Sequence, residues 1–172
     1  MNLKSTLFLF WVACLFTISC SKRVEDNLAE SGNFLKVTID GDERVFTDVK
    51  GRWIDGGDYL EITAQADGST WVSINVLSEN GRVPIGNYQL DDDTGFGLLG
   101  IYSYTENDVQ YNYTASPNTV SLLDEFSLHI QNISDRSVEG TFAGRLIQMR
   151  GLEVVGDVEL TDGSFFTAIA SE

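Results

Sequence analysis

From Phe34 onward, hydrophobic and polar residues alternate with a period of two, and no stretch sustains the period of roughly 3.6 residues that marks a helix. Turn signals interrupt this alternation at short intervals, and the candidates are Asp40-Gly41, Gly56-Gly57, Asp67-Gly68, Asn80-Gly81, Asn107-Asp108 and Asp162-Gly163. Short alternating segments between turns are typical of antiparallel β proteins. The pattern predicts an all-β domain, an antiparallel two-sheet sandwich, with a small lipocalin-like antiparallel barrel as the alternative.

Residues 58–77 predict a hairpin whose register follows from parity. The apolar positions 60, 62 and 64 face one way, and so do 72, 74 and 76. A three-residue loop at positions 67–69 places Ala64 opposite Val72 and Ile62 opposite Ile74, so that both sets reach the core. Trp71 then lies on the other, polar face, where it is a candidate for binding a glycan or a protein partner.

Residues 101–114, IYSYTENDVQYNYT, predict a second hairpin with a two-residue loop at Asn107-Asp108. Tyr102 then opposes Tyr113 and Tyr104 opposes Tyr111, so four tyrosines share one face. Such a face can stack sugar rings or aromatic ligands, and it can equally form one wall of the core, since its reverse is polar. The candidate ligand-binding residues are Tyr102, Tyr104, Tyr111, Tyr113 and Trp71.

The first 19 residues show a different pattern. Lys4 is their only charge, residues 7–16 are nearly all apolar, and Ser19 precedes Cys20. A positive start, a short apolar region and a small residue at the exit predict a secretory signal peptide. The apolar run is shorter than the roughly 20 residues that a transmembrane helix needs.

The stretch LFTISCSKRVED around Cys20 resembles a bacterial lipoprotein signal, with Thr17 where leucine is usual. The resemblance implies cleavage before Cys20, lipidation of its sulfur and, with Ser21 following, sorting to the outer membrane. Residues 20–32 are polar and predict a flexible tether to a domain at 33–172. Whether that domain faces the periplasm or the exterior stays open.

Several short motifs resemble small Bacteroidota lipoproteins with a β-rich domain of unassigned function. They are Phe34 followed by Asp40-Gly41, PIGNYQL at 84–90, GTFAG at 140–144 and LTDGSF at 160–165. The resemblance implies an outer-membrane lipoprotein and a β-rich fold, and it implies no activity.

The net charge and the cysteine content limit which partners and which thiol-based sites are expected. The formal net charge is −15, and it becomes −16 once residues 1–19 are removed, which argues against nucleic acid and anionic lipid headgroups as partners. Cys14 leaves with the signal and Cys20 becomes the first residue, so a disulfide, a thiol nucleophile and a zinc–thiolate site are not expected.

Motifs for catalysis or cofactors are weak. His129 is the single histidine, no G-x-S-x-G stretch occurs, and the glycines at 95, 97 and 100 lack the helix that dinucleotide binding needs. Asp91 and Asp93 are weak cation candidates in a loop better explained as a solvated acidic turn. We therefore expect no cofactor, no metal and no enzyme activity.

The expected function is binding, to a glycan or other small ligand, by a domain held at the membrane through its lipid. The alternative is a structural or protein-interaction module of the cell envelope without a small-molecule ligand.

Overall fold

The computed structural model describes residues 32–79, 81–90, 94–117 and 123–170, which form eleven strands and one short 3-10 segment. In chain order the elements are β1 (Phe34–Ile39), β2 (Asp42–Phe46), β3 (Asp48–Ile54), η1 (Asp55–Gly57), β4 (Tyr59–Ala66), β5 (Thr70–Ser78), β6 (Gly86–Gln89), β7 (Phe96–Glu106), β8 (Val109–Ala115), β9 (Glu125–Ile133), β10 (Ser137–Arg150) and β11 (Glu153–Ala170). The expected signal peptide at 1–19, and the tether at 20–32 except for Gly32, lie outside the described residues.

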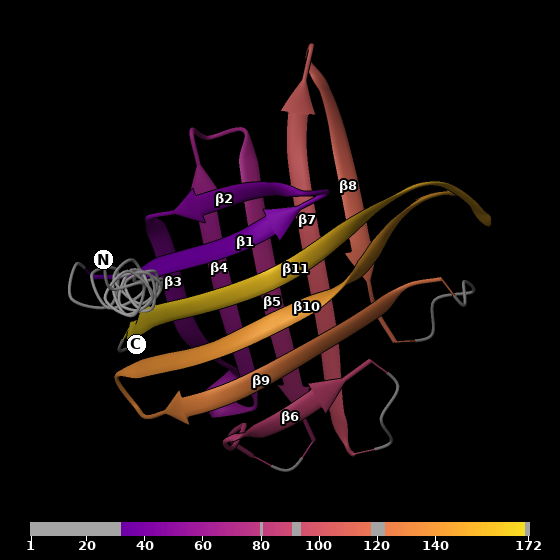
Figure 1. Ribbon diagram of the computed structural model, residues 1–172. Coiled ribbons are helices and arrows are strands. Elements are labelled where there is room, and N and C mark those ends of the chain that lie inside the picture. The colour runs from indigo at the N-terminus through magenta and orange to yellow at the C-terminus, as the bar shows by residue number, and fades with distance from the viewer. Residues whose placement is uncertain (1–31, 80, 91–93, 118–122, 171–172) are drawn as a thin grey trace, which may run out of the picture. The chain divides into compact units, whose positions relative to one another are not determined.

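The prediction of an all-β fold is confirmed. The described strands form one hydrogen-bonded sheet in the order β2-β1-β11-β3-β4-β5-β7-β8-β10-β9-β6, with a further pairing between β10 and β11. Figure 1 shows this sheet as two layers, in which β3, β4, β5, β7 and β8 lie behind and the remaining strands cross in front of them. The layers of the predicted sandwich are thus parts of a single sheet, and this sheet is not the closed barrel of the alternative.

The two longest strands explain why the layers are joined. β10 pairs with β9 over most of its first half, and further along Ile147 pairs with Thr114 of β8 in the other layer. β11 pairs with β1 and β10, and at its end Ile169 pairs in parallel with Gly51 of β3. Each long strand therefore begins in one layer and reaches the other.

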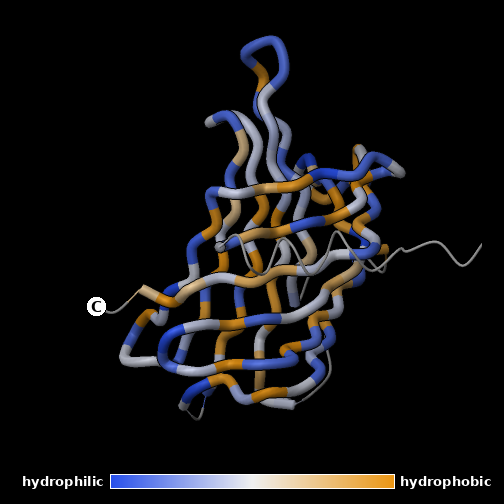
Figure 2. Tube along the Cα trace, turned by 60° about the vertical axis from the view of Figure 1, so that its left-hand side comes forward, coloured by the Kyte–Doolittle hydropathy of each residue, from blue (hydrophilic) through white to orange (hydrophobic). Residues whose placement is uncertain are grey.

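The core lies between the two layers, and hydrophobic and hydrophilic residues alternate along the strands that enclose it (Figure 2). The register predicted for β4 and β5 is confirmed, with Ala64 opposite Val72 and Ile62 opposite Ile74. The inward-facing residues that are fully buried include Leu35, Val37, Leu60, Ile62, Ala64, Ile74, Val76 and Ile130. Burial of these faces is the main stabilising contribution, at about 25 cal/mol for each Å² of apolar surface.

The turns predicted at Asp40-Gly41, Gly56-Gly57, Asp67-Gly68 and Asn107-Asp108 are confirmed, Asn80 of the predicted Asn80-Gly81 turn lies outside the described residues, and one predicted turn is absent. Asn107 and Asp108 both have positive φ, 50° and 63°, as a two-residue hairpin loop requires. The prediction of a turn at Asp162-Gly163 was wrong, because these residues lie inside β11 where its pairing shifts register. Asp162 has a φ of 52° there. A β-bulge and a turn both use residues with positive φ, so the dipeptide alone does not distinguish them.

Three glycines in the front layer allow strands and aromatic rings to approach closely. A Cβ atom at Gly140, Gly144 or Gly163 would lie 2.4, 2.3 or 2.5 Å from a carbonyl oxygen of a neighbouring strand. The ring of Phe165 covers Gly140, the ring of Phe126 covers Gly144 and the ring of Phe142 covers Gly163. The three rings form a row, with centroids 6.3 Å apart for Phe165 and Phe142 and 6.0 Å apart for Phe142 and Phe126. The GTFAG motif is therefore a packing motif, in which glycine makes room for an aromatic ring.

Candidate ligand-binding groove

An open groove of about 430 Å³ lies between the β7–β8 hairpin and the β1–β2 hairpin, and we refer to it as the tyrosine groove. It is lined by Ile39, Asp40, Asp42, Arg44, Thr70, Tyr102, Tyr104, Thr105, Glu106, Tyr113 and Val158. In Figure 1 the turn between β1 and β2 ends in front of β7, which is where the two hairpins approach one another.

One wall of the groove is a stack of tyrosine rings on β7 and β8. The predicted pairs are confirmed, with Tyr102 opposite Tyr113 and Tyr104 opposite Tyr111. Tyr104 lies at the centre of the stack. Its ring is 14° from parallel to that of Tyr111, with centroids 5.0 Å apart, and 13° from parallel to that of Tyr113, with centroids 6.2 Å apart. Cross-strand pairing thus places neighbouring rings nearly parallel and in contact distance.

Burial along the tyrosine stack is graded. Tyr102, nearest the middle of the sheet, is only 8% exposed and belongs to the core cluster. Tyr104, Tyr111 and Tyr113 are half-buried, and Tyr104 and Tyr113 line the groove. The sequence allowed this face to be either a wall of the core or a surface for a ligand. Each interpretation therefore describes one part of the face.

The opposite wall comes from the edge strand β2 and the turn before it. Arg44 and Asp42 pair with Val37 and Ile39, so their side chains lie on the inward face although they are exposed at the edge. Arg44 Nη2 is 3.9 Å from Asp42 Oδ2. Asp40 is held in the turn because its Oδ1 accepts a hydrogen bond from the Glu159 N–H at 2.9 Å. Its own N–H donates to the Glu159 carbonyl at 3.0 Å, so the turn is fixed against β11.

The surroundings of the groove raise the pKa of two of its phenols, Tyr102 and Tyr104. Partial burial, a hydrogen bond with Tyr113 and the negative charges of Glu106 and Asp40 raise the pKa of Tyr104 from 10.0 to about 12. Burial also raises the pKa of Tyr102, against the opposing effect of the Arg44 charge. At neutral pH these hydroxyl groups can therefore both donate and accept hydrogen bonds.

Trp71 does not join the tyrosines. It lies opposite Gln65 on β4 and Ser103 on β7, on the outer face of the rear layer, as its parity predicted. There it lines a shallow hollow of about 330 Å³ with Asp48, Lys50 and Gln65 among its neighbours. The five candidate residues from the sequence therefore belong to two separate faces.

A further aromatic residue, Trp53, was not assigned a place by the sequence pattern beyond a turn-rich segment. It lies in β3, is 9% exposed and faces the core. The Arg82 guanidinium lies over its ring at 5.3 Å and forms an ion pair with Asp135. Within the described residues, no acceptor reaches the indole nitrogen.

His129 lies on the outer face of the front layer, as predicted. It alternates with Leu128 and Ile130, which are buried, and it is itself half-buried in β9. Its Nδ1 is buried and has no hydrogen-bond partner among the residues that the structure describes.

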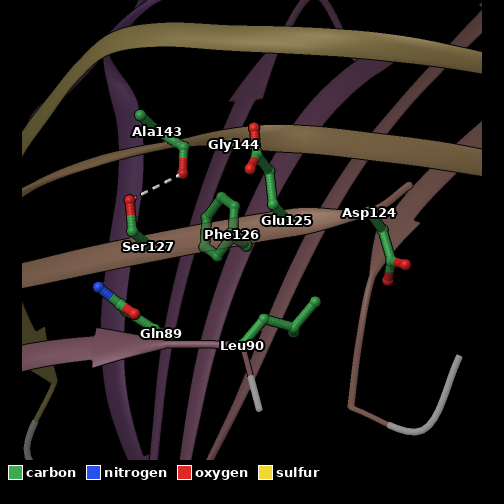
Figure 3. A pocket seen from close by; sticks show the side chains of 8 residues that line it. All are labelled: Gln89, Leu90, Asp124, Glu125, Phe126, Ser127, Ala143 and Gly144. Carbon is green, nitrogen blue, oxygen red and sulfur yellow. Dashed lines mark hydrogen bonds between the residues drawn. The ribbon is translucent and has the colours of Figure 1, made fainter. Parts of the chain in front are cut away.

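A second hollow, of about 380 Å³, lies where β6 ends against β9 and β10 (Figure 3). Ser127 Oγ donates to the Ala143 carbonyl at 3.2 Å, and Asp124 Oδ2 accepts from the Ser116 N–H at 3.3 Å. Figure 3 shows the carboxylates of Asp124 and Glu125 pointing away from one another. These two acids do not form the convergent carboxylate pair that glycosidase chemistry requires.

The weak cation candidates Asp91 and Asp93 lie outside the described residues. Among 32–79, 81–90, 94–117 and 123–170, no group of three or more histidine, cysteine, aspartate or glutamate side chains is arranged to hold a metal ion. The same ranges contain no helix that is long and apolar enough to cross a membrane.

The acidic and basic residues of the groove, Asp40, Asp42, Arg44 and Glu106, were missed by the sequence reasoning. In the sequence these residues lie in or next to the turn dipeptides Asp40-Gly41 and Asn107-Asp108, or in the strand between Asp42 and Phe46. None of these patterns indicates that the two hairpins approach one another. Comparisons with protein-family models, curated proteins and solved structures found no match for this chain.

Proposed function

We propose that this domain acts by binding and that the tyrosine groove takes a glycan or another small molecule with a flat face. The observation that carries this proposal is the near-parallel arrangement of Tyr104 and Tyr113 along the wall of an open groove. The rings of such a stack offer apolar contact to the flat side of a sugar ring, and their hydroxyl groups can add hydrogen bonds.

The size and polarity of the groove support a ligand of this class. Its volume of about 430 Å³ lies within the range of roughly 300–1,000 Å³ for small-molecule sites. Apolar contact comes mainly from the tyrosine rings, since Ile39 and Val158 are buried at the base of the groove, and carboxylates that line it can accept hydrogen bonds from sugar hydroxyl groups. Because the groove is open, one end of a longer chain can extend into solvent.

We also propose that Cys20 is lipidated and that its acyl chains hold the domain at the outer membrane. Two or three buried chains would give lasting attachment, since each buried CH₂ contributes about 0.8 kcal/mol. The polar segment at 20–32 would then act as the tether between membrane and domain.

A glycan-binding screen on the full chain, purified in detergent, tests the function. Binding of the best glycan should weaken at least about tenfold, or roughly 1.4 kcal/mol, in Tyr104→Ala. Trp71→Ala is the matched control, because it removes an aromatic side chain from the opposite face and should leave affinity unchanged. Loss of binding in Trp71→Ala alone would move the site to the outer face. Absence of any binding at millimolar glycan would reject the proposal and favour a structural or protein-interaction module.

A further inference from the structure

The charged side chains of the tyrosine groove are mostly acidic. Asp40, Asp42 and Glu106 line it, and Arg44 is the one basic residue among its lining residues. Arg44 lies within ion-pair distance of Asp42, at 3.9 Å. The lining residues thus carry three negative charges and one positive charge.

The position of Asp40 is fixed rather than incidental. Its backbone has a φ of 49°, and hydrogen bonds in both directions with Glu159 hold the turn against β11. Only one of its two carboxylate oxygens takes part in those hydrogen bonds. Asp40 therefore presents a negative charge at a defined place on the wall opposite the tyrosines.

The tyrosine rings of the groove, like its carboxylates, favour a positively charged group. The face of a tyrosine ring carries negative potential, and it attracts an ammonium group within about 6 Å of the ring centre. Asp40 and Glu106 line the groove together with Tyr104, and after burial and the contact with Tyr113 their negative charges add to the raised pKa of Tyr104. The carboxylates and the tyrosine rings that line the groove would therefore both favour a positively charged group.

We propose that the tyrosine groove selects a ligand that carries a protonated amine beside a flat ring, as an amino sugar does, over the neutral or acidic sugar of the same shape. The inference rests on the proposed function, because it names the class of glycan that the same site takes. The flat ring packs against the tyrosines, and the ammonium group lies near the carboxylates of Asp40 and Glu106.

The experiment compares a glucosamine tetramer with its fully N-acetylated counterpart, which has the same backbone without the charge. Calorimetry on the full chain in detergent, at about pH 6, keeps the amines protonated because this pH is below the pKa of an α-amino group. The amine form should bind at least about tenfold tighter, and added salt should reduce that difference. Equal affinity for the two tetramers would overturn the inference and leave the proposed function standing.

Substitutions locate the charge effect. Asp40→Asn and Glu106→Gln should each weaken the amine form several-fold and leave the acetylated form unchanged, while Arg44→Gln should strengthen the amine form. Glu125→Gln, in the hollow between β6, β9 and β10, removes the same charge elsewhere and should have no effect on either. An equal loss in Glu125→Gln would show that only net charge matters and would sink the assignment.

Two further outcomes separate the possibilities. Tetralysine that binds as tightly as the glucosamine tetramer would show recognition of charge without a ring, against the amino-sugar assignment. If neither tetramer binds while another glycan binds through Tyr104, the inference alone fails. If no glycan binds at all, the proposed function fails, and the inference falls with it.

Discussion

Tyr104 and Tyr111 face each other directly across the β7–β8 hairpin, with ring centroids 5.0 Å apart and planes 14° from parallel. The pairing follows from the two-residue loop between them, since a shift of one residue would move one of the rings to the other face of the sheet. The same loop therefore sets the hairpin register and the stacking surface of the groove.

The ionisation of Tyr104 provides a spectroscopic test of its surroundings. Because the pKa of Tyr104 is raised from 10.0 to about 12, the tyrosinate absorbance of the wild type should include a step near pH 12. The amplitude of that step should fall by the equivalent of one tyrosine in Tyr104→Phe. A highest-pH step that survives the substitution unchanged would contradict the environment described for this residue.

The same raised pKa predicts how stability depends on pH. In the unfolded chain Tyr104 ionises near pH 10 and in the folded chain near pH 12, so the folded state holds this proton more tightly. Its contribution is fully present below about pH 10 and is lost as pH rises through about 12. Denaturant unfolding at increasing alkaline pH should show a smaller loss of stability in Tyr104→Phe than in the wild type.

The close approach at Gly144 predicts a large cost for a single methyl group. A Cβ atom there would lie 2.3 Å from the Glu125 carbonyl oxygen and 2.8 Å from the Phe126 ring, so β9 and β10 would have to separate. We expect Gly144→Ala to reduce the free energy of unfolding by about 3 kcal/mol in urea denaturation.

Gly97→Ala is the matched control for that substitution. Its Cβ would meet only Leu77, at 3.5 Å, which is ordinary contact, so its effect should stay within about 1 kcal/mol. Similar costs for the two substitutions would show that the approach between β9 and β10 is not as close as the geometry indicates.

The contact of Arg82 with Trp53 can be separated from its ion pair with Asp135. Arg82→Ala removes both the stacked guanidinium and the ion pair, and should destabilise the domain by about 1 kcal/mol while shifting tryptophan fluorescence to the red. Asp135→Ala removes only the exposed ion pair and should cost less than about 0.5 kcal/mol. A larger effect from Asp135→Ala would identify the ion pair as the important contact.

Lipidation of Cys20 is tested in cells that process lipoproteins. A labelled fatty acid should enter the wild-type chain and should not enter Cys20→Ala. Equal labelling of both chains would reject Cys20 as the modified residue. Cys14→Ala, in the apolar segment, should be labelled like the wild type.

The parts of the structure that the sequence predicted depend on neighbours along the chain. In the β4–β5 and β7–β8 hairpins, a loop of known length and the parity of apolar residues fix which residues face each other. Those two conditions placed Ile62 opposite Ile74 and Tyr104 opposite Tyr111, as the structure has them. They also placed Trp71 on the outer face, and the pairing of Val72 with Tyr102 confirms that the tyrosines lie on the other one.

The second wall of the groove could not be predicted in this way. The β1–β2 turn reaches the tyrosines because Ile39 pairs with Leu160 and Asp40 exchanges hydrogen bonds with Glu159, contacts between distant parts of the chain. Periodicity reports which side of a strand is apolar, and it carries no information on which distant strand lies beside it. The charge of the groove, and with it the proposed preference for an amine, therefore appeared only in three dimensions.

The placement of β11 has a consequence for how the domain is made. This strand pairs with β1 near the start of the domain, with β10, and with β3 in the other layer. Strand contacts between distant segments form slowly, because the intervening chain must first be brought together at an entropic cost. The two layers therefore cannot close until β11 has been synthesised, so the domain completes its folding only after most of the chain has been made.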